Sequence, residues 1–258
     1  AAYLACSAAA RVGAGLVTLA TPQSLVPTLA SRLIETTFLP LPEVGTGGTG
    51  HEAVSIIAQQ AGECQALLIG PGIGQDPATA ELVRRLLPSL PASRSLVIDA
   101  DALNILASTP KWWEIVKGQA VLTPHPGEMA RLTGGAVAQI QQDRLHTARR
   151  AAAQWKQTVV LKGAYTVIAT PSGTAFGLTA ISPWANPALA SAGTGDVLAG
   201  AIAGLLAQGL SPEAAAIAGV YIHGLAGDMA ARNMGDAGIL ASDLLPLLPT
   251  AIRKIKAG

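Results

Sequence analysis

The 258-residue sequence has little of what an extracellular or nucleic-acid-binding protein needs. Its two cysteines, Cys6 and Cys64, show no C-x-x-C spacing, so neither a disulfide framework nor a zinc site is indicated. We therefore expect a reducing, cytoplasmic location. Aromatic residues make up only 3%, the formal net charge is +1, and no basic block is present. Because nucleic-acid binding needs clustered Lys and Arg, we expect no nucleic-acid partner.

Hydrophobic runs of membrane-spanning length are also lacking. The run at residues 197–207 is about half of the roughly 20 residues that a membrane helix needs, so we interpret it as a buried helix and expect no membrane partner. We expect no signal peptide at the start of the chain. The sequence starts at Ala1 without a methionine and within an apparent helix, so we expect an N-terminally truncated chain. With 50% hydrophobic residues, residues 1–258 can form the core of a single domain.

Short apolar runs alternate with helical segments along the chain. We predict strands at residues 16–20, 34–39, 66–69, 96–98, 120–122 and 158–161, with 166–169 as the hairpin partner of the last, and helices at 1–12, 22–31, 51–61, 77–87, 102–107, 197–207 and 217–231. This alternation is typical of a mostly parallel sheet covered by helices on both faces. Ligands bind beyond the carboxyl ends of such strands, so we expect the motifs that follow them to form one site.

Residues 45–50 match the G-x-G-x-x-G pattern of dinucleotide-binding proteins. The context argues against that function. Pro40 and Pro42 stand where the preceding strand should be, and no suitably placed acid follows about 20 residues later. We interpret the segment as a flexible loop.

The segment at residues 186–210 organises the candidate site. A turn containing Gly193, Thr194 and Gly195 leads into a helix whose first N–H groups have no internal partner, which makes the turn a good anion hole for a phosphate. Asp196 follows at once. A carboxylate beside a bound phosphate is unfavourable, so Asp196 is either a helix N-cap or a group that handles a proton.

Other polar residues follow the predicted strands, and each has a structural alternative. Lys162 either reaches a phosphate or is a surface lysine. His125, between two prolines, either contacts a substrate or fills its loop, and Glu128 is a carboxylate favoured by a helix N-terminus. Asp99 and Asp101 are candidate helix caps, with Asp101 preferred. We interpret His223 as a core or interface histidine.

The order of the motifs along the chain resembles a known family. The motifs are GPGIG, VIDADALNIL, LTPHPGEMARL, VVLKGAYTVIA, NPALASAGTGDVLAGAIAGLLAQG and YIHGLAGD. They resemble the ADP/ATP-dependent NAD(P)H-hydrate dehydratases of the ribokinase-like superfamily. The resemblance implies a three-layer α/β/α sandwich around a mostly parallel central sheet.

The resemblance also implies a reaction. The substrates would be NADHX or NADPHX, nicotinamide cofactors hydrated at C6. Phosphate would pass from ADP or ATP to the C6 hydroxyl and then be eliminated, with Mg²⁺ bridging the nucleotide phosphates. Bacterial members of the family usually use ADP and release AMP and phosphate.

Site residues follow from the same resemblance. Asp196 would be the general base next to the substrate hydroxyl, and the N–H groups of Gly193 to Gly195 would stabilise the transferred phosphoryl group. Contacts to the hydrated cofactor are expected from Ala1, Gly72, Gly74, His125 and Asp196, and contacts to the nucleotide from Lys162, Gly163, Ala164, Tyr165, Thr166 and Gly195. Glu128 would orient Mg²⁺ through water.

Two alternatives and two assemblies stay open. Small-molecule kinases of the superfamily carry T-P-N-x-x-E where this chain has Thr123-Pro124-His125-Pro126-Gly127-Glu128, and histidine followed by Pro-Gly resembles the dehydratases instead. A kinase that releases a phosphorylated product is the main alternative. A catalytically silent nucleotide-binding module is the second. The family resemblance implies a homo-oligomer, with a tetramer favoured, and fusion to an upstream NAD(P)HX epimerase domain.

Overall fold

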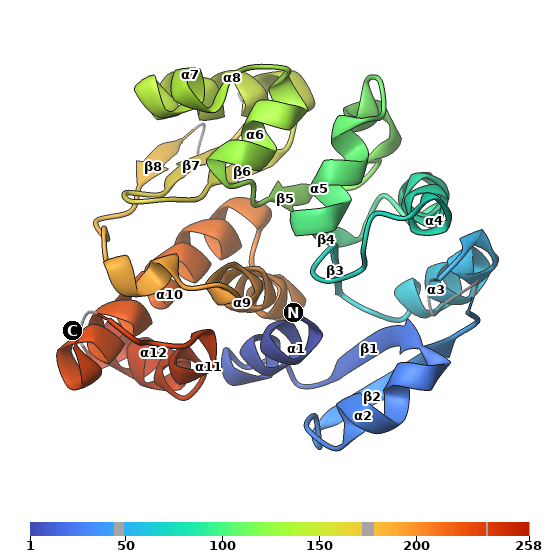
Figure 1. Ribbon diagram of the computed structural model, residues 1–258, viewed down its shortest axis with the longest axis horizontal. Helices are drawn as coiled ribbons and strands as arrows, with labels where there is room; N and C mark the ends of the chain where they lie inside the picture. The colour runs from blue at the N-terminus through green and yellow to red at the C-terminus, as the bar shows by residue number, and fades with distance from the viewer. Residues whose placement is uncertain (44–48, 172–177, 236, 258) are drawn as a thin grey trace.

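The computed structural model describes residues 1–43, 49–171, 178–235 and 237–257 (Figure 1). Its centre is a six-stranded sheet with the strand order β3-β4-β5-β6-β7-β8. The strands are β3 (Ala66–Ile69), β4 (Ser95–Ile98), β5 (Ala120–Leu122), β6 (Thr158–Leu161), β7 (Val167–Ala169) and β8 (Thr179–Ile181). Strands β3 to β6 run parallel, whereas β7 and β8 are antiparallel additions at one edge. The carboxyl ends of the four parallel strands therefore lie at one edge of the sheet.

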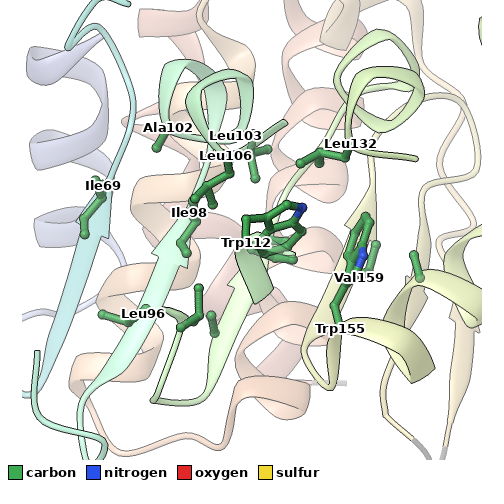
Figure 2. Packing of buried hydrophobic residues seen from close by; sticks show 14 of the residues in the cluster. Ile69, Leu96, Ile98, Ala102, Leu103, Leu106, Trp112, Leu132, Trp155 and Val159 are labelled. Atoms are coloured by element: carbon green, nitrogen blue, oxygen red, sulfur yellow. The ribbon is translucent and has the colours of Figure 1, made fainter. Parts of the chain in front are cut away.

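The central strands are almost wholly apolar because helices cover both of their faces. In β4, the side chains of Leu96 and Ile98 enter one core and that of Val97 enters the other. In β6, Val160 likewise lies opposite its two apolar neighbours in the strand. This alternation follows from the two-residue period of a strand. Figure 2 shows the first core, where Leu96, Ile98 and Val159 pack near the rings of Trp112 and Trp155, which are tilted by 57° with centroids 4.9 Å apart.

Two groups of helices complete a three-layer α/β/α sandwich (Figure 1). The first core is covered by α3 (Val54–Ala61), α4 (Pro77–Ser89), α5 (Ala100–Ala107), α6 (Pro126–Thr133), α7 (Val137–Gln142) and α8 (Arg144–Trp155). The second is covered by α1 (Ala2–Arg11), α9 (Thr194–Ala207), α10 (Pro212–Met234), α11 (Ala241–Leu244) and α12 (Leu247–Ala257). Helix α9 crosses the second face beneath β3 and β4, so its N-terminal turn lies near the strand ends.

Helix α10 is the one described helix long and apolar enough to cross a membrane by length and composition. In this protein 61% of its apolar window is buried, and it packs against α9 and α12. Its hydrophobicity is therefore accounted for by its place in the second core.

A separate pair of parallel strands, β1 (Val17–Pro22) and β2 (Thr36–Leu41), follows α1. The connection contains the 3₁₀ turn η1 (Gln23–Leu25) and α2 (Val26–Ala30). The argument that Pro40 excludes a strand is wrong, because Pro40 pairs with Thr21 at the end of this two-stranded sheet, where a missing N–H is tolerated. The predicted loop at residues 45–50 lies outside the described residues, except for Thr49 and Gly50.

Most predicted elements are present with shifted ends. The helix predicted at residues 217–231 extends over Pro212–Met234, since Ser211 caps it and Pro212 occupies its first turn. Strand β8 was not predicted, and neither were α7, α8, α11 and α12. The 3₁₀ turns η2 (His51–Ala53), η3 (Trp112–Ile115) and η4 (Pro187–Ala190) complete the described elements.

Candidate active site

Residues from two neighbouring strand ends meet at Glu128. The Nε2 atom of His125 lies 3.4 Å from one carboxylate oxygen of Glu128, and the Nζ atom of Lys162 lies 3.7 Å from the other. The backbone N–H of Lys162 also donates to the Pro124 carbonyl at 2.9 Å. The segments after β5 and β6 are therefore brought together on one side of the molecule, as expected for parallel strands.

The turn before α9 reaches the same place. Gly193 is the N-cap residue and adopts the left-handed conformation, with φ of 90°, which glycine adopts without strain. A Cβ on Gly195 would lie only 3.4 Å from the Nζ atom of Lys162. The unpaired N–H groups of the first helical turn thus lie beside a lysine ammonium, an arrangement that suits an anion.

Asp196 stands in the first turn of α9 and does not cap it. The N-cap position belongs to Gly193, and no side-chain cap hydrogen bond is present there. The structural alternative of Asp196 as an N-cap is therefore wrong. The side chain is only 18% exposed, and its Oδ2 lies 3.7 Å from the N-terminal nitrogen of Ala1.

The surroundings of Asp196 make it a stronger base than an exposed aspartate. Burial raises the pKa of the carboxyl group, Asp99 raises it further, and Lys162 lowers it. The net pKa lies above the ordinary aspartate value. A carboxylate with a raised pKa beside an anion hole is suited to accept a proton from a hydroxyl group.

Lys162 is not an ordinary surface lysine. Its Nζ atom donates to Oδ1 of Asp99 at 2.7 Å, and its side chain is only 17% exposed. Sequence reasoning considered Asp99 as a cap and missed this ion pair. The signal was that Asp99 directly follows β4, as Lys162 follows β6.

The preference for Asp101 as the cap of α5 is wrong. Asp99 holds the N-cap position without a side-chain cap bond, and Asp101 lies inside the first turn. Its carboxylate instead accepts the N–H of Gly74 at 3.0 Å and the side-chain amide of Gln75 at 2.8 Å. Asp101 therefore ties the glycine loop after β3 to the start of α5.

That glycine loop lies against the N-terminus of the chain. A Cβ on Gly72 would lie 2.9 Å from the Cβ of Ala1, whose nitrogen faces Asp196. Three predicted substrate contacts, Ala1, Gly72 and Asp196, are thus neighbours. Gly74 lies in the same loop, where its N–H donates to the Asp101 carboxylate.

His125 starts α6 and leaves part of its ring free. Its Nδ1 atom accepts the N–H groups of Gly127 at 2.9 Å and Glu128 at 3.3 Å, and Glu128 accepts the N–H of His125 in return. This reciprocal arrangement is a capping box, which accounts for Glu128 at the helix start as predicted. With Nδ1 as acceptor, the ring proton resides on Nε2. The side chain remains 49% exposed and can contact a ligand.

A cavity of about 320 Å³ opens beside Lys162 and the α9 turn. Its polar lining includes the side chains of Thr166 and Asn186, and its apolar lining includes Trp184 and Leu189. The predicted nucleotide contacts Lys162, Gly163, Ala164, Thr166 and Gly195 all line it. Tyr165 does not: it is 57% exposed, with its N–H bonded to the Trp184 carbonyl. Sequence reasoning missed Trp184, because its place in the cavity depends on β8, a strand that was not predicted.

His223 is buried in α10, as expected of a core histidine. Its Nε2 atom lies 2.9 Å from the carbonyl oxygen of Thr194, so the ring holds the turn that forms the anion hole. Burial lowers the pKa of His223 to about 4. The histidine is therefore neutral at neutral pH and donates Nε2–H to that carbonyl.

The described residues contain no cluster of three or more His, Cys, Asp or Glu side chains that could hold a metal by themselves. Near the anion hole, the Glu128 carboxylate lies 3.7 Å from the Lys162 ammonium, whereas Asp99 is fully buried and paired with Lys162. This donor set fits Mg²⁺ bound mainly by nucleotide phosphates, with few protein carboxylates, which is how this cation is commonly held.

Comparison with solved structures places the fold in a class. A ribokinase-like superfamily protein from Enterococcus faecalis superposes with a TM-score of 0.77 over 98% of this chain and 81% of that one, at 29% identity. The fold is therefore ribokinase-like. The NAD(P)H-hydrate dehydratase family model matches residues 1–250, and the chain belongs to this family.

Individual relatives agree. The bifunctional NAD(P)H-hydrate repair enzyme of Moorella thermoacetica is 46% identical over 98% of this chain, which spans 47% of that protein. The chain thus spans about half the length of the bifunctional relatives. The ADP-dependent (S)-NAD(P)H-hydrate dehydratase of Xanthomonas campestris is 36% identical over 99% of this chain and 84% of its own length. The ADP/ATP-dependent NAD(P)H-hydrate dehydratase of Bacillus subtilis, crystallised with ATP and Mg²⁺, has a TM-score of 0.79 at 32% identity and covers 98% of this chain and 86% of its own.

Proposed function

We propose that this protein dehydrates NADHX and NADPHX to NADH and NADPH at the expense of ADP or ATP. The observation that carries the proposal is the half-buried carboxylate of Asp196, which does not cap α9 and lies beside a glycine turn and a lysine ammonium. Hydroxide is a poor leaving group, and phosphorylation of the C6 hydroxyl turns it into a better one.

In the first step, Asp196 takes the proton of the C6 hydroxyl while the hydroxyl oxygen attacks the terminal phosphorus of the nucleotide. The phosphorus–oxygen bond to the remaining nucleotide breaks, so that ADP yields AMP. The N–H groups at Gly193 to Gly195 stabilise the charge on the phosphoryl oxygens. Phosphate then leaves C6, a proton is lost from the ring, and the reduced nicotinamide is restored.

The two substrates would meet at Asp196. Ala1 and Gly72 beside Asp196, together with Gly74 and His125, are assigned to the hydrated nicotinamide. The cavity of about 320 Å³ at residues 162–166 and Gly195 forms the side assigned to the nucleotide, with Trp184 and Leu189 offering apolar surface to a base. The family membership supports both assignments.

Mg²⁺ would neutralise charge on the nucleotide phosphates. Glu128 is the residue assigned to orient it through water, because its carboxylate lies next to Lys162 at the phosphate end of the site. Lys162 would contact the same phosphates directly.

The test is to incubate the protein with NADHX, Mg²⁺ and either ADP or ATP, and to follow the near-ultraviolet absorbance of reduced nicotinamide. We expect the absorbance to return, with AMP and phosphate released when ADP is used. A phosphorylated product that accumulates without regained absorbance would favour the kinase alternative. No reaction with either nucleotide would favour a silent binding module.

The proposal includes the setting of the protein. We treat residues 1–258 as one dehydratase domain in a cytoplasmic homo-oligomer, with a tetramer favoured; light scattering of the purified protein tests the oligomer. The free cysteines Cys6 and Cys64 suit a reducing compartment. Fusion to an epimerase domain is suggested by the bifunctional relatives and is tested by the full reading frame.

A further inference from the structure

Lys162 is held at three points. Its backbone N–H donates to the Pro124 carbonyl at 2.9 Å, and its backbone carbonyl accepts from Nη2 of Arg144 at 3.3 Å. The same Arg144 nitrogen bonds the Leu161 carbonyl at 2.9 Å. The third point is the ammonium group, bonded to Asp99 at 2.7 Å. A lysine side chain that is fixed at both ends has lost most of the rotamer freedom that this residue type usually keeps.

Asp99 has no other visible task among the described residues. Its side chain is 1% exposed, and it stands at the N-cap position of α5 without making a cap hydrogen bond. Its side chain accepts a hydrogen bond from the Lys162 ammonium. A carboxylate buried this completely is retained only if it is paired, and its removal leaves a buried ammonium with a weaker partner, Glu128 at 3.7 Å.

The ion pair also fixes where the Lys162 ammonium points. Asp99 comes from the end of β4, and the ammonium lies 3.4 Å from where a Cβ on Gly195 would be. The ammonium is therefore suspended between a buried carboxylate and the first turn of α9. The backbone after Asp99 turns sharply, with Ala100 at a φ of 50°, a strained conformation for a non-glycine residue.

We propose that Asp99 is a positioning residue, which holds the Lys162 ammonium against the anion hole so that it meets the transferred phosphoryl group without rearrangement. This inference rests on the proposed function. Asp99 itself does not touch the substrate. Its negative charge also acts on Asp196, the proposed base, which faces the Lys162 ammonium and the Asp99 carboxylate.

The test compares Asp99→Asn with Lys162→Gln. For Asp99→Asn we expect kcat to fall roughly tenfold to a hundredfold, because a misplaced group costs more in the transition state than in the bound ground state, while the KM for ADP changes much less. The acidic limb of the pH–rate profile should move to lower pH in Asp99→Asn, because a charge that raises the pKa of Asp196 is gone. It should move to higher pH in Lys162→Gln, because a charge that lowers this pKa is gone.

The double variant Asp99→Asn/Lys162→Gln separates positioning from a merely structural role. If Asp99 acts through Lys162, the double variant should have the same kcat as Lys162→Gln alone. Losses that multiply would overturn the inference, and so would an Asp99→Asn enzyme with the wild-type kcat and pH profile. Glu81→Gln, which removes an exposed ion pair with Arg85 on α4, is the control and should keep wild-type activity.

Two further outcomes stay distinguishable. If wild-type protein does not convert NADHX, the proposed function fails before Asp99 is tested. If Asp99→Asn does not fold, the double variant still carries the test, because removing both members of a buried ion pair is tolerated better than removing one. In that case, a double variant with a lower kcat than Lys162→Gln would contradict the inference.

Discussion

Two pairs of glycines in and beside helix α9 have different roles, one at the ligand site and one in helix packing. At its N-terminal end, Gly193 forms the left-handed turn, and Gly195 leaves space toward Lys162 and the cavity. In its middle, Gly200 and Gly204 are buried against α1. A Cβ on Gly200 would overlap the Ala5 carbonyl oxygen, and one on Gly204 would lie 2.6 Å from the Ala9 carbonyl oxygen.

The difference is between space kept for a ligand and space already filled by a neighbouring helix. Helix α1 approaches α9 closely only because the middle pair lacks side chains, and α1 in turn carries Ala1 to Asp196. The middle of α9 therefore serves stability and the placement of α1. Its N-terminal turn serves the reaction, so changes in the two regions should affect different measurements.

The largest effect is expected at the N-terminal end, from Asp196→Asn. Loss of the general base should lower kcat by about 10²–10⁴, while ADP binding and the free energy of unfolding change little. In the wild type, activity should fall as pH drops through the raised pKa of Asp196, at a pH above the ordinary aspartate range. Steady-state kinetics and calorimetric ADP titration measure the two quantities.

The control is Glu52→Gln, an exposed carboxylate on η2 that should leave kcat unchanged. An Asp196→Asn protein with near wild-type turnover would remove the functional half of the comparison.

The next effect concerns His223, which holds the turn from the core side. Its pKa of about 4 lies below the ordinary value of 6.5, so its contribution to stability is complete above pH 6.5 and is lost as pH falls toward 4. The full loss is about 3 kcal/mol, from a shift of that size. His223→Gln should flatten the pH dependence of the free energy of unfolding in this window. His146→Gln, an exposed site in α8, should keep the wild-type slope.

Gly200→Ala should lower the free energy of unfolding by about 2 kcal/mol. Overpacking a core commonly costs about 1–3 kcal/mol, and the better helix propensity of alanine returns part of it. Urea unfolding measures the effect. Gly15→Ala is the matched control, because a Cβ there meets nothing within 4 Å, and it should be nearly neutral. Equal stability of the two variants would contradict the tight contact between α1 and α9.

The smallest effect, and the sharpest for the comparison, is expected from Gly195→Ala. The new methyl group would face only the Lys162 ammonium at 3.4 Å, so the protein should be at least as stable as the wild type. The methyl group occupies space intended for a phosphate, and kcat/KM for ADP should fall about tenfold, or about 1.4 kcal/mol. A variant that loses stability but keeps activity would reverse the roles assigned to the two glycine pairs.

Local patterns were sufficient for much of the fold. Apolar runs such as residues 158–161 predicted the parallel strands, since a strand buried on both faces has few alternatives. Strand β8 was missed because three partly exposed residues carry no period that distinguishes them. The prediction at Pro40 was wrong because proline, which lacks an N–H, is tolerated in an edge strand but not in a central strand.

The location of the site could be predicted from the sequence, but the pairs of side chains that interact there could not. The carboxyl ends of parallel strands must converge, so motifs after β5 and β6 could be assigned to one edge. The pairing of Asp99 with Lys162 joins residues 63 positions apart, and nothing local distinguishes it from a helix cap. The cap of α5 was assigned to Asp101 for the same reason, because cap propensity ignores a loop that arrives from β3.

The way α6 begins allows its N-cap residue, His125, to be exchanged without loss of the helix start. At that position the helix asks only for a side-chain acceptor, which the Nδ1 atom of His125 provides. Asparagine, a preferred N-cap residue, would meet the same need. An exchange between the two therefore leaves the scaffold intact and alters only the group presented to a bound molecule. A single substitution at this position can therefore change the chemistry of the site while the fold keeps its stability.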